Sequence, residues 1–305
     1  MSKPSDATPP VDPTPSLKED LSTLIKLRLN TFVLITAFFG YLLGWKSLGA
    51  EWTWDALWAL VHTLLGTAAS AFGAAVFNQV MEVDSDARMA RTANRPLPAR
   101  RILPPYAFGL GWALCAFGVI HLGAMISFSA AILAAITIGT YVFIYTPMKR
   151  VSSVNTLIGA IPGAIPPMMG WVGAGHGLAE AAPWFLFALL FLWQLPHFVA
   201  INWLCREEYE EANYKMWSDR DRSGQRSAGL YIGFSLLMVL LPLPAPFLGL
   251  TGWIFPPIGM LLAIFLILTA VKFLRTRERT DMRKAFFATL LYLPLALAAL
   301  AVDWH

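Results

Sequence analysis

Charged residues are scarce in this chain of 305 residues: Asp, Glu, Lys and Arg together make up 14%, whereas apolar residues make up 57%. An ordinary soluble domain contains about 25% charged residues, so a single globule of this composition would have too little polar surface to stay in water. The composition therefore argues against a soluble enzyme and against an intrinsically disordered protein.

Cysteine is nearly absent as well. Cys115 and Cys205 lie in different apolar segments, and neither has a C-x-x-C or Cys/His spacing around it. We interpret both as small core residues, so the sequence offers no disulfide scaffold and no cysteine-based metal site. The net charge of +4 could suggest a nucleic-acid partner. We expect none, because the basic residues lie in connections between apolar runs and not on one face of a folded domain.

Long apolar runs are abundant. A membrane-spanning helix needs about 20 mostly apolar residues. The sequence contains nine such runs, at residues 29–47, 54–80, 105–122, 124–146, 153–174, 181–203, 229–249, 251–273 and 285–303. Prolines inside or at the ends of several runs predict kinked helices. We therefore predict an all-α polytopic membrane protein, a bundle of about nine transmembrane helices.

Positive charge is missing from one side of the predicted bundle. Nine spans place all of the 23 Lys and Arg residues except Lys46 in segments on a single side, which the positive-inside rule assigns to the cytoplasm. We expect an integral protein of a bacterial plasma (inner) membrane, with a cytoplasmic N-terminus and an external C-terminus. The long connections at 82–104 and 204–228 fall on the cytoplasmic side, where we expect the active site.

The domain organisation follows from the same pattern. Residues 1–24 are rich in proline and acidic residues, and we expect them to form a disordered cytoplasmic tail with no cleaved signal peptide. We expect residues 25–305 to form a single transmembrane domain.

The end of the second run carries a ladder of oxygen ligands. Asn78, Glu82 and Asp86 recur every four residues, so on an unbroken helix they line one face, while Asp84 points nearly the opposite way and ranks behind them as a ligand. Oxygen ligands of this kind suit Mg²⁺ ions that bridge to substrate phosphates.

Basic residues follow these acids directly. The diphosphate-binding candidates are Arg88, Arg91 and Arg95, together with Lys149 and Arg150 after the fourth run. Acids that hold Mg²⁺ and bases that hold phosphate are the groups that ionisation of an allylic diphosphate requires. A positive-inside loop whose acids pair with neighbouring arginines remains the alternative interpretation.

The sixth run and the connection after it hold a third polar group. His197 lies near the cytoplasmic end of the run, beside Gln194 and Asn202, and is either a hydrogen-bonded core residue or a functional imidazole. The candidates for a second metal or diphosphate shell are Arg206, Glu207, Glu208, Tyr209 and Glu211. These could equally form a solvated acidic loop.

Three sequence blocks resemble a known family. They read NQVMEVDSDARMARTANRPL, YTPMKRVSSVNTLIGAIPGAIPPMMGW and WQLPHFVAINWLCREEYEEANY. They are similar to the UbiA-type intramembrane prenyltransferases and, within these, to the protohaem IX farnesyltransferases, or haem O synthases. The resemblance covers roughly residues 25 to 303 and implies a helical bundle around a central cavity that opens to the cytoplasm and to lipid.

The resemblance also implies an activity. Family members transfer the farnesyl group of farnesyl diphosphate to the 2-vinyl group of haem B (protohaem IX), which gives haem O; Mg²⁺ helps to expel diphosphate, and haem B is a substrate and not a cofactor. On this chain the implied metal ligands are Asn78, Glu82 and Asp86. The implied diphosphate ligands are Arg91, Arg95, Lys149 and Arg150, and His197 is the implied haem contact.

Two departures from the superfamily pattern matter. Position 82 is Glu where the pattern has Asp, and no Asp-rich second motif is present, since Glu207 and Glu211 have its spacing only. The number of Mg²⁺ ions therefore stays open.

Three functions remain to be compared. The leading one is farnesyl transfer to haem, with haem A synthase or terminal-oxidase assembly factors as protein partners. The second is prenylation of an aromatic acid or a chlorophyll-like ring by a UbiA-type enzyme. The third is a non-catalytic haem transporter or assembly factor, which would not need Asn78, Glu82 and Asp86 as a set.

Overall fold

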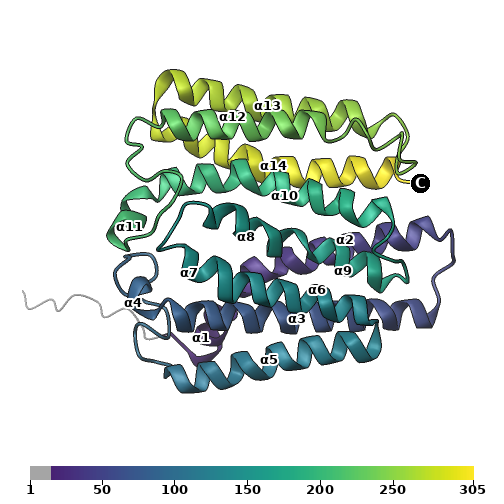
Figure 1. Ribbon diagram of the computed structural model, residues 1–305, viewed down its shortest axis with the longest axis horizontal. Helices are drawn as coiled ribbons and strands as arrows, with labels where there is room; N and C mark the ends of the chain where they lie inside the picture. Colours follow the sequence, from purple (N-terminus) through teal and green to yellow (C-terminus); the bar gives the residue numbers. More distant parts are fainter. Residues whose placement is uncertain (1–14) are drawn as a thin grey trace, which may run out of the picture.

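The computed structural model describes residues 15–305, which fold into helices joined by turns (Figure 1). The first helices are α1 (Leu17–Leu24), α2 (Leu27–Ser47), α3 (Trp54–Met81), α4 (Val83–Asp86), α5 (Pro104–Met125), α6 (Phe128–Ile138), the π-helix η1 (Gly139–Tyr145) and α7 (Thr146–Met148). The remaining helices are α8 (Asn155–Ala164), α9 (Pro166–Gly173), α10 (Ala181–Leu204), α11 (Arg206–Glu211), α12 (Gln225–Leu240), α13 (Phe255–Thr276) and α14 (Arg279–Asp303). The predicted all-α fold class is confirmed.

Seven helical segments within residues 15–305 are long and apolar enough to cross a membrane: α2, α3, α5, the continuous run 128–148, α10, α13 and α14. The other two predicted spans take a different form. The span at 153–174 is divided into α8 and α9 at Ile165, just before Pro166, because proline has no amide hydrogen to donate to the preceding turn. The span at 229–249 is shortened to α12. The predicted count of nine is therefore approximate.

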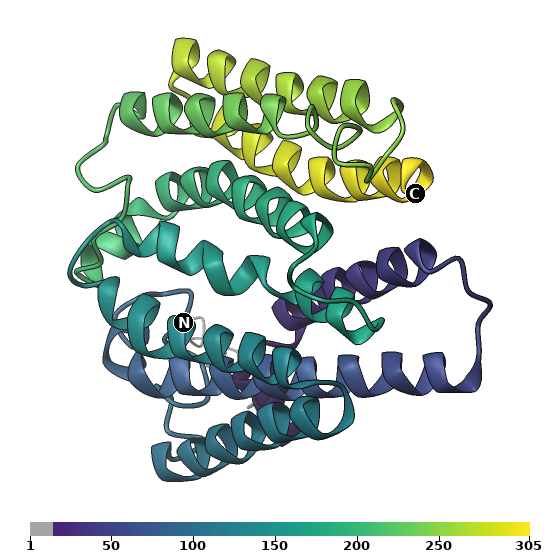
Figure 2. The same ribbon diagram turned by 45° about the vertical axis from the view of Figure 1, so that its right-hand side comes forward.

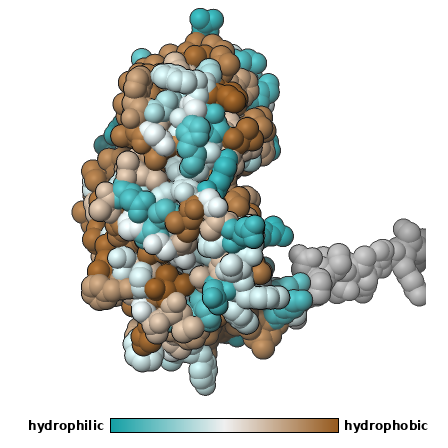
Figure 3. Space-filling model, turned by 90° about the vertical axis from the view of Figure 1, so that its right-hand side faces the viewer, coloured by the Kyte–Doolittle hydropathy of each residue, from teal (hydrophilic) through white to brown (hydrophobic). Residues whose placement is uncertain are grey.

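The flanks of the bundle expose large apolar side chains, among them Phe32, Trp112, Phe143 and Leu268. Viewed from the end that holds the C-terminus, hydrophobic residues gather along the flanks and hydrophilic residues gather on the end face (Figure 3). Exposure of large apolar side chains is favourable in lipid and unfavourable in water. Together with the seven long helices, this surface identifies an integral membrane protein.

Successive long helices run in alternating directions, so their connections collect at two ends. One end holds α1, α4, α11 and the turn between α13 and α14 (Figure 1); we call it the basic end, because it carries every Lys and Arg of residues 15–305 except Lys46. The C-terminus and the connection between α2 and α3 lie at the opposite end. In a second view, α12, α13 and α14 lie together on one side and α3 and α5 on the other, with α8 and α10 between them (Figure 2).

The first helix corrects the prediction of a disordered segment at 1–24. Residues 1–14 lie outside the described range, but Leu17–Leu24 form α1 because Ser16 and Glu19 make a reciprocal capping box. The Asp20 carboxylate accepts hydrogen bonds from Arg101 at 2.8–3.1 Å, which attaches α1 to the connection before α5. Helix α1 thus lies at the basic end, attached to the rest of the bundle by this ion pair.

Glycines allow α2 and α9 to cross at backbone distance. A Cβ atom added at Gly40 would overlap the Pro167 carbonyl, and one added at Gly170 would overlap the Ala37 carbonyl oxygen. The obstacle in each case is backbone, which cannot rotate away as a side chain can. The crossing therefore requires glycine at both positions.

We predict that Gly170→Ala lowers the thermal unfolding temperature in detergent, because overpacking a closed contact costs about 1–3 kcal/mol. Gly233→Ala in α12 is the matched control, since a Cβ atom there meets nothing within 4 Å and alanine favours helix over glycine. Equal unfolding temperatures for the two variants would contradict the prediction.

Candidate active site

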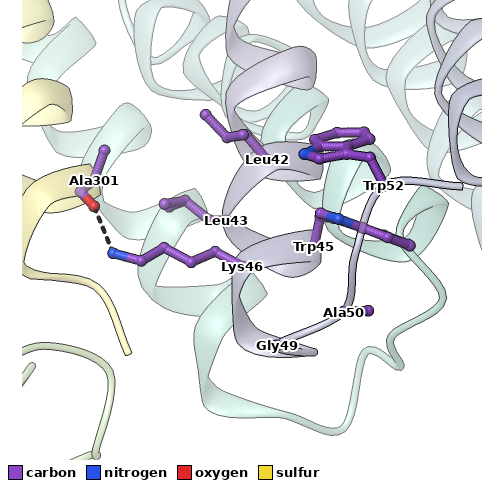
Figure 4. A pocket seen from close by; sticks show the side chains of 8 residues that line it. All are labelled: Leu42, Leu43, Trp45, Lys46, Gly49, Ala50, Trp52 and Ala301. Atoms are coloured by element: carbon purple, nitrogen blue, oxygen red, sulfur yellow. Dashed lines mark hydrogen bonds between the residues drawn. The ribbon is translucent and has the colours of Figure 1, made fainter.

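Two cavities differ in their chemistry. The larger, of about 390 Å³, lies at the opposite end beside Trp45 and Trp52 (Figure 4). Its one charged side chain is Lys46, whose Nζ donates a hydrogen bond to the Ala301 carbonyl oxygen at 3.0 Å. A site with one ammonium group and no carboxylate cannot hold a metal–diphosphate complex.

The smaller cavity, of about 230 Å³, lies at the basic end. Four cationic side chains and two carboxylates line it: Lys26, Arg91, Arg95, Lys149, Glu82 and Asp86. This surplus of positive charge suits an anionic ligand that carries more negative charge than the two carboxylates do. The candidate active site is therefore here, on the side that the sequence predicts.

The acids reach this cavity through a break in the helix. Helix α3 ends at Met81, Glu82 has φ −104° and ψ 8°, and the short helix α4 begins at Val83. The helix is therefore not continuous from Asn78 to Asp86, as the single-face ladder assumed: the Glu82 amide still donates to the Asn78 carbonyl, but the Glu82 backbone leaves the helical conformation and a new turn starts at Val83. The turn still closes, since the Asp86 amide donates to the Glu82 carbonyl at 2.7 Å, and both carboxylates line the cavity.

Each carboxylate is paired with one of the predicted basic residues. Lys149 Nζ lies 2.7 Å from Glu82 Oε1, and Arg95 lies 2.7 Å from Asp86 Oδ2. Burial raises the pKa of the Glu82 carboxyl, but the charges of Lys149 and Lys26 outweigh burial and leave that pKa below its ordinary value. Both partners are therefore ionised, and the pair is stable although it is buried.

Lys26 is a site residue that the sequence analysis counted only as a positive-inside charge. It begins α2 in the left-handed conformation, with φ 49°, which is uncommon for a side chain other than glycine. Its Nζ lies 2.5 Å from Asn78 Oδ1 and 3.3 Å from Tyr141 Oη. Asn78 is fully buried, and it is connected to the cavity by its hydrogen bond with Lys26, which lines the cavity. Local sequence does not reveal this contact, because the two residues are 52 positions apart.

The π-helix η1 supplies two further residues that the sequence did not indicate. Tyr141 and Tyr145 line the cavity, with ring centroids 5.4 Å apart, and the ammonium group of Lys149 lies 4.6 Å from the centroid of the Tyr145 ring. Single turns of π-helix often mark functional sites. Here the π-helix presents both aromatic rings on the same side of the chain as Lys149.

The connection after α11 closes the cavity from the basic end. Tyr214 lines it, and its buried hydroxyl group lies near Glu82 and Ser85 without a hydrogen bond of good geometry to either of them. Burial and the nearby Glu82 charge raise the pKa of Tyr214 to about 12, so the hydroxyl remains a donor. An unpaired buried donor is costly, and a ligand oxygen would satisfy it. Arg91 links the two connections, because its Nε lies 3.4 Å from Glu208 Oε2.

Several predicted residues lie outside the cavity. Asp84 and Arg88 are exposed, which agrees with the low rank of Asp84. Arg150 donates to Ser85 Oγ at 2.6 Å, and Arg206 pairs with the exposed Glu207. Glu211 is also exposed. Of the residues predicted for a second metal or diphosphate shell, only Tyr209 lines the cavity, and Glu208 forms an ion pair with Arg91.

His197 lies on α10 against α14 and does not line the cavity. Its Nδ1 is 2.9 Å from Thr289 Oγ1, and its ring packs on Trp193 and Phe286. Ile201, one turn further along α10, does line the cavity. His197 is therefore a neighbour of the site, with one ring nitrogen in a hydrogen bond.

The donor set fits a Mg²⁺–diphosphate complex. Glu82 and Asp86 supply hard carboxylate oxygens and Asn78 an amide oxygen, which are the ligands that Mg²⁺ prefers. Each of these oxygens lies against an ammonium or guanidinium group. With a metal ion on the carboxylates, these cations would be free to bind diphosphate oxygens.

Comparison with known proteins identifies the family of the chain. Residues 33–293 match the UbiA prenyltransferase family. A protoheme IX farnesyltransferase from Opitutus terrae is 40% identical over 287 residues, which cover 93% of this chain and 94% of that protein.

Two solved structures share the fold. A digeranylgeranylglyceryl phosphate synthase has a TM-score of 0.76 at 16% identity and covers 94% of this chain and 98% of its own. A UbiA homologue from Archaeoglobus fulgidus, bound to GPP and Mg²⁺, has a TM-score of 0.63 at 15% identity and covers 92% of this chain and 99% of its own. With a family match over most of its length and a near full-length relative at 40% identity, the chain belongs to the UbiA prenyltransferase family.

Proposed function

We propose that this protein transfers the farnesyl group of farnesyl diphosphate to the 2-vinyl group of haem B to form haem O. The observation that carries the proposal is the 40% identity to a protoheme IX farnesyltransferase over nearly the full length of both chains. The cavity at the basic end supports it, because four cations and two carboxylates converge there on a space next to aromatic and apolar side chains.

The basic residues bind the diphosphate in this proposal. Arg95 and Lys149 leave their carboxylate partners for phosphate oxygens, and the guanidinium group of Arg95 can make two parallel hydrogen bonds. Lys26 and Tyr214, which also line the cavity, provide further donors. As the carbon–oxygen bond breaks, these fixed donors stabilise the charge that grows on the leaving diphosphate.

Asn78, Glu82 and Asp86 would hold Mg²⁺. When bound, the ion neutralises part of the diphosphate charge and makes it a better leaving group. The Archaeoglobus fulgidus homologue binds Mg²⁺ together with GPP, which supports the same pairing of metal and prenyl diphosphate here.

The allylic cation left on C1 of the farnesyl group faces Tyr141 and Tyr145. The π-faces of these rings attract a cation, and the position of Lys149 over Tyr145 already shows such a contact. Leu29, Phe198 and Ile201 provide apolar lining for the tail. The vinyl group of haem then attacks C1, and water adds to the resulting cation with loss of a proton.

The acceptor is proposed to approach along α10. His197 lies one turn from Ile201, and its ring packs against the rings of Trp193 and Phe286. Flat aromatic side chains of this kind can pack against a porphyrin. Thr289 orients the imidazole through Nδ1. Nε2 is therefore the atom we assign to haem.

The basic end is proposed to face the cytoplasm of a bacterial cell. The support is the positive-inside rule, since Lys46 is the one Lys or Arg of residues 15–305 found at the opposite end. Haem A synthase and oxidase assembly factors remain proposed partners.

Expression in a bacterial membrane that lacks its own haem O synthase tests the function. We expect extracted haem to contain a new species with the mass of the hydroxyethylfarnesyl derivative, and we expect it to be absent with Asp86→Asn. Unchanged haem B from a well-inserted protein would contradict the proposal; prenylated aromatic acids would then indicate the second function, and no prenylated product the third.

The metal assignment gives a second prediction. Glu82→Gln and Asp86→Asn should each reduce turnover about 100-fold or more, the magnitude typical of removing a group that acts on developing charge. Asp84→Asn is the matched control, because Asp84 belongs to the same short helix but is exposed. Normal turnover in either cavity variant, or equal loss in the control, would refute the assignment.

The haem contact gives a third prediction. His197→Ala should raise the KM for haem B and leave the affinity for farnesyl diphosphate unchanged, because the imidazole lies outside the charged cavity. Calorimetric binding of a non-hydrolysable farnesyl diphosphate analogue, set beside steady-state kinetics with haem, separates the two effects. Equal loss of both would mean that His197 has a packing role.

A further inference from the structure

Two imidazole rings meet near the opposite end of the bundle, far from the candidate active site. Nδ1 of His62 on α3 lies 3.1 Å from Nε2 of His121 on α5, and the ring centroids are 5.0 Å apart. Both side chains are half-buried. Neither histidine has a carboxylate partner within residues 15–305, so an ion pair does not account for the position of either ring.

The packing of α3 on α5 brings these rings together. The two helices touch through small residues, and a Cβ atom added at Gly118 would overlap Ser70 and crowd the Gly66 carbonyl oxygen. His62 comes four residues before Gly66, and His121 comes three residues after Gly118. Because the helices are antiparallel, both imidazoles project at the same end of this close contact.

Aromatic side chains support each ring. Trp58 stacks on His62 with centroids 5.9 Å apart, and Phe117 stacks on His121 with centroids 5.0 Å apart. Each aromatic residue lies one turn from its histidine on the same helix. The stacking restricts both rings to orientations in which the facing nitrogen atoms stay close.

We propose that His62 and His121 form a binding site for a divalent transition-metal ion such as Cu²⁺ or Zn²⁺. Zn–N bonds of about 2.0–2.1 Å place two nitrogen ligands about 2.9 Å apart at a right angle and about 3.3 Å apart at a tetrahedral angle. The observed separation of 3.1 Å lies between these values. Imidazole suits these metals.

Binding requires a change of tautomer and a rotation of the rings, because the metal ion lies beside the line that joins the two nitrogens and both lone pairs must point to it. In the hydrogen-bonded pair, one of the two facing nitrogens carries a proton. With the metal bound, that proton moves to the outer nitrogen of the same ring, so that both Nδ1 of His62 and Nε2 of His121 present lone pairs. Among residues 15–305 no cluster of three or more His, Cys, Asp or Glu side chains is found, so water completes the coordination.

The ion would join α3 to α5 at a distance from the proposed chemistry. Asn78 lies 16 residues further along α3, about 24 Å along the helix axis. The site is therefore independent of prenyl transfer. A ligand that binds the folded state alone also stabilises it, so the bound ion would strengthen the contact between these two helices.

Titration of the purified full-length protein with Cu²⁺ in excess Mg²⁺ tests the proposal, with pulsed electron paramagnetic resonance to count imidazole ligands. We expect one Cu²⁺ per chain with two imidazole nitrogens. His62→Gln and His121→Gln should each weaken binding about 100-fold or more, because losing a ligand costs at least as much as losing its supporting contact. His176→Gln, at the same end but outside the pair, should change nothing.

A second variant keeps the test decisive if the glutamine variants lose stability. His62→Cys replaces the imidazole by a thiolate that also binds Zn²⁺, so it should restore the Zn²⁺ affinity lost in His62→Gln. A wild-type protein without nitrogen-ligated Cu²⁺, or a His62→Gln protein with the wild-type signal, would overturn the proposal.

Discussion

The compensation of charge at the end of α3 that lies at the basic end of the bundle is the constraint on which the rest of the structure depends. Glu82 and Asp86 are almost fully buried at the edge of a membrane bundle, where an unpaired carboxylate would be very costly. Lys149 and Arg95 pair with them at 2.7 Å. Because Lys149 comes from the end of the fourth span and Arg95 from the connection that follows α4, both segments must fold onto the end of α3.

The helices that supply the residues of the cavity depart from regular α-helix near those residues. Glu82 ends α3, and Lys26 begins α2 in a left-handed conformation. The π-helix η1 presents Tyr141 and Tyr145 to the cavity. Another irregularity, the break between α8 and α9 at Pro166, is explained by proline and lies outside the cavity lining. The irregularities at Glu82, Lys26 and η1 bring side chains to the proposed diphosphate site, as expected where chemistry contributes to the backbone conformation.

Much of the site could be predicted from sequence, since its acids and arginines lie within one segment. Spacing along the chain indicated Glu82, Asp86 and Arg95, and the positive end of the fourth span indicated Lys149. The same reasoning failed for Lys26, which was counted only as a positive-inside charge, and for Tyr145 and Tyr214, which lie within the quoted blocks but were not singled out there because a tyrosine alone does not indicate a role. It also placed Arg150 at the diphosphate, whereas its guanidinium group bonds to Ser85.

The sequence by itself determined that this is a helical membrane protein with its charge at one end, because hydropathy and the distribution of Lys and Arg are properties of short segments that need no partner. It also determined the family resemblance through three continuous blocks. Tertiary structure alone decided which cations meet which carboxylates, that His197 faces α14, and that His62 meets His121. Except for Arg95 and Asp86, which are nine positions apart, these contacts join residues dozens of positions apart. The crossing of helices, which depends on all of their packing surfaces together, brings them within hydrogen-bond distance.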